Sequence, residues 1–309
     1  MVPKPSAART ALSAKLVQQH LNNTCALCPV CGDLTSYAFP RDACSFSKRV
    51  SDRQFFSGDT FGASIQKCLN CGHLHVWPLL TQDQLADLYA NRYSRQAPSA
   101  HAMERAKSQW QFFERHLPPS FDLSSSLKVV ELGCSYGHLL AHFSFSSKLV
   151  CYEPDPDHSA EALKDRNRVE IVRSVVIGDE LEDDSVDFWI GSHSLEHIAD
   201  PHLLFQAAQK KIRVGRFMFQ EFPTSQGDEA YPKGDVIGNF HLNWFTQSSI
   251  TLLASRYGFV PMGLQFVEGV RPVSNGDIGD TNFNRYIKAR VIRILFQLVH
   301  KADGLPRHN

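Results

Sequence analysis

A single segment, Val129–Gly137 with the sequence VVELGCSYG, constrains the fold of this chain more than any other. Its apolar residues run up to Leu132, and Gly133 then breaks the run. An apolar pattern at helical spacing resumes over 138–143, so the segment predicts a buried strand, a tight turn and a helix. That succession is the first unit of an open α/β sheet, in which ligands bind beyond the carboxyl ends of the strands.

The glycine turn distinguishes between two classes of ligand. A dinucleotide pyrophosphate requires G-x-G-x-x-G, whose middle glycine makes room for phosphate. Here Ser135 stands in the middle, and Gly133 and Gly137 form only G-x-x-x-G. S-adenosylmethionine has no phosphate and carries an ammonium group, which suits the acid Glu131 just before the turn. A carboxylate for a ribose is expected roughly 20 residues further on, where Glu153 ends the predicted strand 148–153.

Three motifs in this order resemble the class I S-adenosylmethionine-dependent methyltransferases. They are E-x-G-x-x-x-G at 131–137, E-P-D-P at 153–156 and S-V-D-F-W-I-G-S-H-S-L-E-H at 185–197. The resemblance implies a Rossmann-like α/β sheet and S-adenosylmethionine as cofactor. It also implies a set of site residues: Glu131, Gly133, Gly137, Glu153, Asp179 and His193 toward the cofactor, and His197 as a candidate catalytic base.

Two copies of C-x-x-C-G precede these motifs. They supply Cys28, Cys31, Cys68 and Cys71, and each pair can direct two thiolates at one ion. Four thiolates form a closed tetrahedral zinc site without an open position for chemistry, so the predicted zinc is structural. Two alternatives stay open: Cys25 extends the first pair to C-x-x-C-x-x-C, a spacing that suits an iron–sulfur cluster, and His73 or His75 can replace a thiolate.

The zinc pairs and a later segment resemble one subgroup, the zinc-bearing sugar and natural-product C-methyltransferases. A helix with Tyr89 and Tyr93 follows the second pair, and the resemblance implies that Tyr93 helps to cover the cofactor. In the segment Gly238–Thr246, His241 stands where the subgroup has its proton-abstracting base. Imidazole has a pKa near working pH and can take a proton from an acidic C–H, hydroxyl or amine. The subgroup's H-E-H pattern is absent because Asn239 and Phe240 precede His241.

These motifs divide the chain into three predicted parts: an N-terminal tail or short helix at 1–24, a zinc-ribbon domain at 25–80 and a methyltransferase domain at 81–309. The 32 Lys and Arg balance 32 Asp and Glu, which argues against a nucleic-acid partner. No apolar run approaches the roughly 18–20 residues that cross a bilayer, so no membrane partner is expected. Residues 1–32 contain no acid, which fits either a targeting peptide or a plain tail. Clustered cysteines point to a reducing compartment, here the cytoplasm.

The expected function is methyl transfer to a small-molecule or carbohydrate acceptor. Two alternatives are a non-catalytic zinc-ribbon recognition protein on a methyltransferase-like scaffold and an NAD-dependent oxidoreductase. The aromatic and basic segment 39–61 fits either a cover over the substrate or a solvated hairpin. Ile287–Val299 is predicted as an amphipathic helix that packs on the core or makes a homodimer contact.

Overall fold

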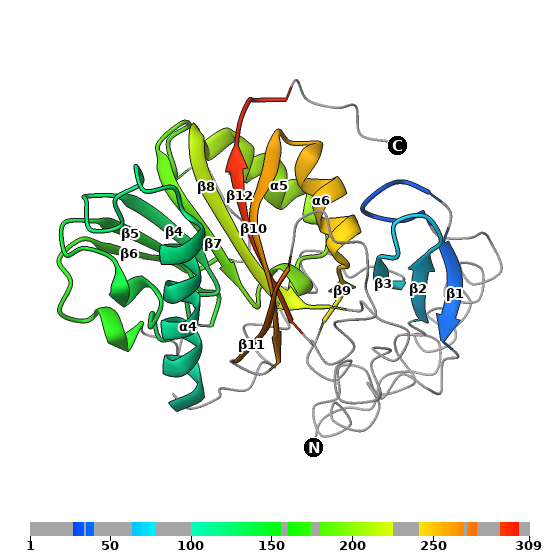
Figure 1. Ribbon diagram of the computed structural model, residues 1–309, viewed down its shortest axis with the longest axis horizontal. Helices are drawn as coiled ribbons and strands as arrows, with labels where there is room; N and C mark the ends of the chain where they lie inside the picture. Colours follow the sequence, from blue (N-terminus) through cyan, green and yellow to red (C-terminus); the bar gives the residue numbers. More distant parts are fainter. Residues whose placement is uncertain are drawn as a thin grey trace, which may run out of the picture.

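The described residues form two β-sheets that lie side by side in space (Figure 1). The computed structural model describes residues 27–33, 35–39, 64–77, 100–155, 160–174, 180–224, 241–268, 271–276 and 291–302. The segments 1–24 and 40–61, Cys25, Tyr93 and Asp179 therefore lie outside the described residues.

The larger sheet has eight strands in the order β11-β10-β12-β8-β7-β4-β5-β6. The parallel half consists of β4 (Lys128–Leu132), β5 (Lys148–Tyr152), β6 (Val169–Val172), β7 (Val186–Ser192) and β8 (Ile212–Pro223). The antiparallel half consists of β10 (Phe259–Glu268), β11 (Arg271–Gly276) and β12 (Val291–Leu298). Strand order reverses between β4 and β7, where the crevice of an open sheet binds its ligand. The predicted Rossmann-like α/β class is confirmed.

Helices cover both faces of this sheet (Figure 1). On one face α4 (Ala100–His116) inserts Phe113, whose ring lies 4.9 Å from Phe188 and 4.8 Å from Phe219. On the other face α5 (Pro201–Lys211) and α6 (Gln247–Ser255) pack against alternate residues of the same strands, such as Trp189 and Met218. Burial on both faces explains why the parallel strands read as continuous apolar runs.

The smaller sheet has the order β1-β2-β3-β9. Its first three strands are β1 (Thr35–Phe39), β2 (Ser64–Cys68) and β3 (Leu74–Trp77). The fourth, β9 (Asn243–Trp244), comes from the segment that the sequence places in the methyltransferase part. Leu74 pairs with Trp244 and His75 with Asn243, so a ladder of backbone hydrogen bonds joins the cysteine region to the larger unit.

The prediction of a C-terminal helix at 287–299 is wrong. Residues 291–298 form β12, which pairs with β8 and β10 in the middle of the antiparallel half. Ile292, Ile294 and Phe296 face α5 and α6, while Leu295 faces α4. An apolar run that is buried on both faces shows no clean two-residue period, so it imitates a helix. Of the two roles expected for this segment, packing in the core is the one that β12 has.

The helix expected directly after the glycine turn is also wrong. Only a short 3₁₀ turn, η3 (Leu140–His142), follows Gly137 before β5, and a second 3₁₀ turn, η4 (Glu161–Leu163), lies after β5. The segment between the turn and β5 contains Ser144, Ser146 and Ser147. Such a short segment with weak helix formers does not repay the cost of helix nucleation.

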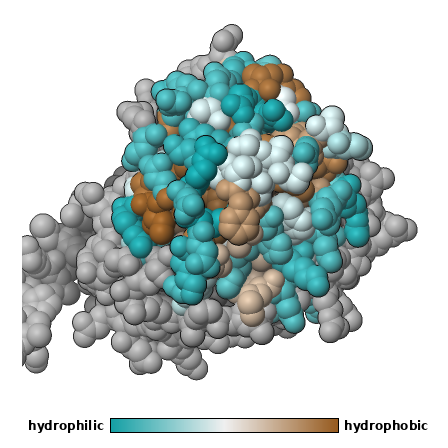
Figure 2. All heavy atoms as spheres, turned by 90° about the vertical axis from the view of Figure 1, so that its left-hand side faces the viewer, coloured by the Kyte–Doolittle hydropathy of each residue, from teal (hydrophilic) through white to brown (hydrophobic). Residues whose placement is uncertain are grey.

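The left-hand side of Figure 1 is mostly hydrophilic, with small hydrophobic patches (Figure 2). The edge strand β6 carries the exposed Glu170, which forms an ion pair over 3.8 Å with the exposed Lys148 of the neighbouring strand. Charged edges discourage pairing with another chain. Among the described residues no helix is both long and apolar enough to span a membrane.

Candidate active site and metal centre

The four predicted cysteines converge on one point. Cys28 Sγ lies 3.7 Å from Cys71 Sγ, Cys31 Sγ lies 3.4 Å from Cys68 Sγ, and all four sulfurs are within 4.8 Å of one another. Tetrahedral zinc with bonds of about 2.3 Å requires sulfurs about 3.8 Å apart. The donor set and its spacing therefore fit zinc.

Each cysteine pair is shaped by a turn that ends in glycine. Gly32 and Gly72 have φ of 81° and 72°, which only glycine adopts without strain. The amide of Val30 points at Cys28 Sγ over 3.4 Å, and the amide of Cys71 points at Cys68 Sγ over 3.4 Å. Such amides stabilise thiolates, as the sequence pattern C-x-x-C-G predicts.

The cysteine turns are held by α6 of the larger unit. Thr246 caps this helix and also donates a hydrogen bond to the carbonyl of Cys71 over 3.0 Å. Arg256, at the other end of α6, donates to the carbonyl of Cys31 over 3.1 Å. His73 is directed away from the cluster, since its Nε2 lies 3.0 Å from Asn243 Oδ1.

The glycine turn after β4 has an unusual backbone conformation, with three residues at positive φ. Gly133, Ser135 and Gly137 all have positive φ, of 67°, 50° and 76°. A Cβ on Gly137 would lie 2.7 Å from Leu163, so this glycine is needed for packing against η4. Among the described residues, a Cβ on Gly133 would meet only Ser194, at 3.5 Å, so the space beside Gly133 is more open than that beside Gly137.

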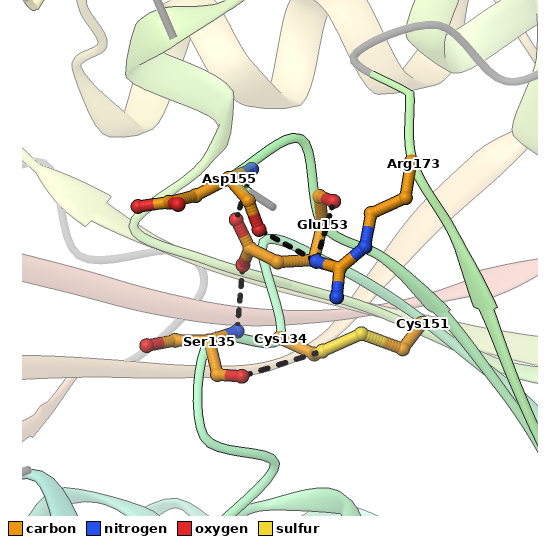
Figure 3. The surroundings of a disulfide bond; sticks show 6 residues. All are labelled: Cys134, Ser135, Cys151, Glu153, Asp155 and Arg173. Atoms are coloured by element: carbon orange, nitrogen blue, oxygen red, sulfur yellow. Dashed lines mark hydrogen bonds between the residues drawn. A yellow bond between two sulfur atoms is a disulfide. The ribbon is translucent and has the colours of Figure 1, made fainter. Parts of the chain in front are cut away.

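Glu153 is fixed at the end of β5 by this turn (Figure 3). The amide of Ser135 donates to Glu153 Oε2 over 2.8 Å, and the amide of Asp155 donates to Oε1 over 3.1 Å. Arg173 donates to the carbonyl of Asp155 over 2.5 Å and so holds the following loop. The predicted ribose carboxylate is therefore held in one orientation beside the glycine turn.

A disulfide between Cys134 and Cys151 lies beneath the same turn (Figure 3). It joins the residue after Gly133 to β5 and closes a loop over a sequence separation of 17. Neither cysteine has a role predicted from sequence, because neither belongs to a C-x-x-C pair. The bond restricts the position of the turn relative to Glu153.

Glu131 is buried in β4 beneath the turn. Its Oε2 is buried without a hydrogen-bond partner among the described residues. Burial, and then the negative charge of Glu153, raise the pKa of Glu131 well above its ordinary value. A cation bound near this carboxyl would reverse that preference and favour the ionised form.

We expect Glu131→Gln to make the thermal stability less dependent on pH. Between the ordinary value of 4.5 and the raised value, the folded protein keeps a proton that the unfolded chain has lost. The free energy of unfolding therefore falls as pH rises through this window. A neutral glutamine removes that slope, which melting temperatures from pH 5 to 9 would reveal. Glu170→Gln, at an exposed carboxylate, is the control, and parallel curves for Glu131→Gln and wild type would contradict the expectation.

His193 ends β7 between two buried carboxylates. Its Nδ1 lies 3.3 Å from Glu196 and its Nε2 lies 3.2 Å from Glu221. Burial opposes protonation, but the two carboxylates outweigh it and raise the pKa of His193 to about 9. The residue has φ of 52°, an unusual conformation for a histidine that marks strained, functional positions.

His197 and His241 lie together beside Glu196. Their rings are 4.9 Å apart, and their Nε2 atoms lie 4.0 Å and 3.8 Å from Glu196 Oε1. Burial, and then the neighbouring His197, lower the pKa of His241 to about 3 although Glu196 acts in the opposite direction. The environment therefore favours the neutral imidazole at His241 and the imidazolium at His193.

The structure thus brings most predicted site residues to the carboxyl ends of β4, β5 and β7. It also adds three residues that sequence reasoning missed: Glu196, Glu221 and Arg293. Arg293 of β12 is fully buried, pairs with Glu221, and donates to Gln265 over 3.1 Å. The sequence signal for Glu196 is its place between Leu195 and His197 in the motif that ends β7. No such signal marks Arg293, which lies in the segment that the sequence predicts as a helix.

The fold and this site define an α/β domain of the kind found in S-adenosylmethionine-dependent methyltransferases. The sequence profile of a family described as a methyltransferase domain matches residues 81–262, more than half of the chain. The chain therefore belongs to this methyltransferase family. No curated protein matches it in sequence.

Solved structures of methyltransferases resemble the chain in fold. Geranyl diphosphate C-methyltransferase from Streptomyces coelicolor A3(2) matches with a TM-score of 0.50 and 12% identity over 71% of this chain and 97% of that one. A methyltransferase from Aquifex aeolicus gives 0.46 and 11% over 71% and 100%. One from Thermotoga maritima, a possible histamine N-methyltransferase, gives 0.46 and 17% over 63% and 91%. Identities this low concern the fold alone.

Proposed function

We propose that the chain transfers the methyl group of S-adenosylmethionine to a small-molecule or sugar-type acceptor, and that its four cysteines hold a structural zinc ion. The observation that carries the proposal is the pair of carboxyl groups, Glu131 and Glu153, at a glycine turn with one open side. A carboxyl beneath the turn suits a cationic ligand, and a carboxylate in the place of Glu153 suits a ribose. The findings favour a methyltransferase over a non-catalytic recognition protein, and Ser135 in place of the middle glycine argues against NAD.

The fit to the cofactor follows from the residues around the turn. Glu153 would accept the ribose hydroxyls, Gly133 would let the cofactor pass close to the backbone, and Glu131 would face its ammonium group. His193, at the end of β7, would lie near the sulfonium. Tyr93 and Asp179 are further candidates from the family resemblance. When bound, S-adenosylmethionine supplies an electrophilic methyl group on a positively charged sulfur.

His241 is the proposed general base, with His197 as the second candidate. A base must hold a free lone pair while the acceptor still carries its proton. His193 does not meet this condition, because its two carboxylates keep it protonated. His241 does meet it, since its Nδ1 is buried without a partner among the described residues. The imidazole of His241 would take the proton that the acceptor loses when its electron pair bonds to the methyl carbon, and the electrons of the C–S bond would remain on sulfur.

Glu153→Ala is expected to weaken binding of S-adenosylhomocysteine by about 1–3 kcal/mol, as for the loss of a buried hydrogen-bond partner. Calorimetric titration measures the effect directly. Glu161→Ala, at an exposed carboxylate of η4, provides a control that keeps the wild-type affinity. Equal affinity of Glu153→Ala and wild type would remove Glu153 from the cofactor site.

The experiment that tests the proposal as a whole is a titration of purified protein with S-adenosylhomocysteine, with NAD as the comparison ligand and a metal assay on the same sample. Micromolar binding of S-adenosylhomocysteine, no binding of NAD and one zinc per chain are expected. One zinc per chain without either nucleoside ligand would favour the recognition protein. Binding of NAD alone would favour the oxidoreductase.

The zinc ion would have a purely structural role, because four thiolates leave no position for water or substrate. Four clustered free thiols also suit a reducing compartment, and we propose the cytoplasm as the site of action.

A further inference from the structure

The carboxylate of Glu196 has an unusual environment. Its side chain is 1% exposed, and the titratable groups that face it among the described residues are three imidazoles, those of His193, His197 and His241. Among the described residues, no backbone amide or hydroxyl donates a hydrogen bond to either of its oxygens. An ionised carboxylate that is buried in this way is costly unless cationic or polar groups compensate it. The histidines are the groups that can do so.

The backbone holds Glu196 and His241 together. Glu196 lies in the 3₁₀ turn η5 (Leu195–His197), and its carbonyl accepts a hydrogen bond of 2.7 Å from the amide of Leu242. Asn243 donates its side-chain amide to the carbonyl of Ile198 over 2.6 Å on the other side of the turn. The turn after β7 and the segment before β9 are therefore fixed against each other on both sides of the histidine pair.

We propose that Glu196 is the positioning residue of the methyl-transfer site: its carboxylate directs Nε2 of His241 toward itself, so that Nδ1 faces the acceptor, and it holds His193 as a fixed cation. This inference rests on the proposed function and assigns a role that the sequence motifs do not. The atom facing Glu196 is His241 Nε2, at 3.8 Å. A carboxylate there selects the tautomer with the proton on Nε2, which leaves the lone pair on Nδ1.

The charges around the cluster support this division of roles. Glu196 faces three imidazoles: that of His193, directly after β7, that of His197, in the same turn as Glu196, and that of His241, in the segment before β9. His193 also faces Glu221 of β8, and Glu221 is paired with Arg293 of β12. Once His241 has taken the acceptor's proton, the Glu196 carboxylate lies 3.8 Å from Nε2 of the new imidazolium. The carboxylate therefore stabilises the product of proton transfer as well as the tautomer that precedes it.

The test is a long-range proton–nitrogen NMR correlation of the histidine rings in ¹⁵N-labelled protein, with signals assigned from His193→Asn and His241→Asn. In the wild type at pH 7.5 we expect His193 to be doubly protonated and His241 to carry its proton on Nε2. In Glu196→Gln the titration midpoint of His193 should fall by at least one pH unit, and His241 should lose its single tautomer. Glu196→Asp, which keeps the charge, should retain a protonated His193.

The control is Asp187→Asn, which removes a buried carboxylate from the opposite end of β7. It should leave both histidine signals unchanged, so that a general loss of stability is excluded as the cause. A wild-type His241 with its proton on Nδ1 would overturn the proposal even if Glu196→Gln does not fold. Two metal ions per wild-type chain and one in Glu196→Gln would also overturn it, because a metal would then hold these side chains. The spectra require neither cofactor nor acceptor, so their outcome is independent of the cofactor titration.

Discussion

Cys71→Ser is expected to release the zinc ion and to lower the melting temperature sharply. Structural zinc contributes roughly 10–16 kcal/mol of binding free energy in small zinc domains, and that energy is folding energy. Serine oxygen is a poor replacement for a thiolate, and the remaining three sulfurs cannot close the tetrahedron. Because Thr246 binds the carbonyl of Cys71, the disturbance reaches the start of α6.

Metal analysis together with thermal unfolding, with and without a chelator, checks this expectation. Asn70→Ala is the matched control, since it removes a 2.5 Å hydrogen bond to Asp33 between the two cysteine turns without touching a ligand. It should keep one zinc per chain, and a chelator should lower its melting temperature as it does that of the wild type. Full zinc content in Cys71→Ser would exclude the four-thiolate assignment and reopen the alternative ligands.

His241→Ala is expected to reduce kcat by about 10²- to 10⁴-fold, the usual contribution of a general base. Cofactor affinity should stay within a factor of about two, because a group that acts only in the chemical step does not contribute to ground-state binding. Transfer of radiolabelled methyl from S-adenosylmethionine to a panel of carbohydrate, phenolic and 1,3-dicarbonyl acceptors measures turnover. Titration with S-adenosylhomocysteine measures binding.

Two further measurements separate a base from a structural histidine. Added imidazole should restore part of the activity of His241→Ala if the missing group is a proton acceptor. His116→Ala, at a partly buried histidine near the end of α4, should retain wild-type turnover. Wild-type kcat in His241→Ala would remove His241 as base and leave His197 as the candidate.

The features that the sequence predicted well are those with strong local chemistry. Two C-x-x-C-G pairs fold as cysteine turns because glycine alone adopts the required φ, and a thiolate pair at that spacing needs few tertiary contacts. The glycine turn and Glu153 were likewise predictable, because the end of a buried strand, a turn and a following strand occur in a fixed order.

The features that the sequence did not predict depend on distant parts of the chain. β12 was interpreted as a helix because both of its faces are buried, which only the finished sheet reveals. Arg293 is a core residue because Glu221 of β8 lies opposite it, and the two positions are far apart in sequence. Glu196 belongs to the site because His241, which is distant in the sequence, lies beside it. Pairwise contacts of this kind leave no periodic signal.

The pairing of β3 with β9 limits where the chain can be divided. The sequence predicts the cysteine region as a separate domain, but the sheet of that region is completed by residues 243–244. Cys28, Val30 and Cys68 also share one apolar cluster with Ile250 and Leu253 of α6. A cut at residue 80 would therefore leave an unpaired strand edge and bare apolar surface on both fragments. A chimera with the cysteine region of a relative would therefore need the relative's segment around His241 as well, because the four cysteines and this segment fold as one unit.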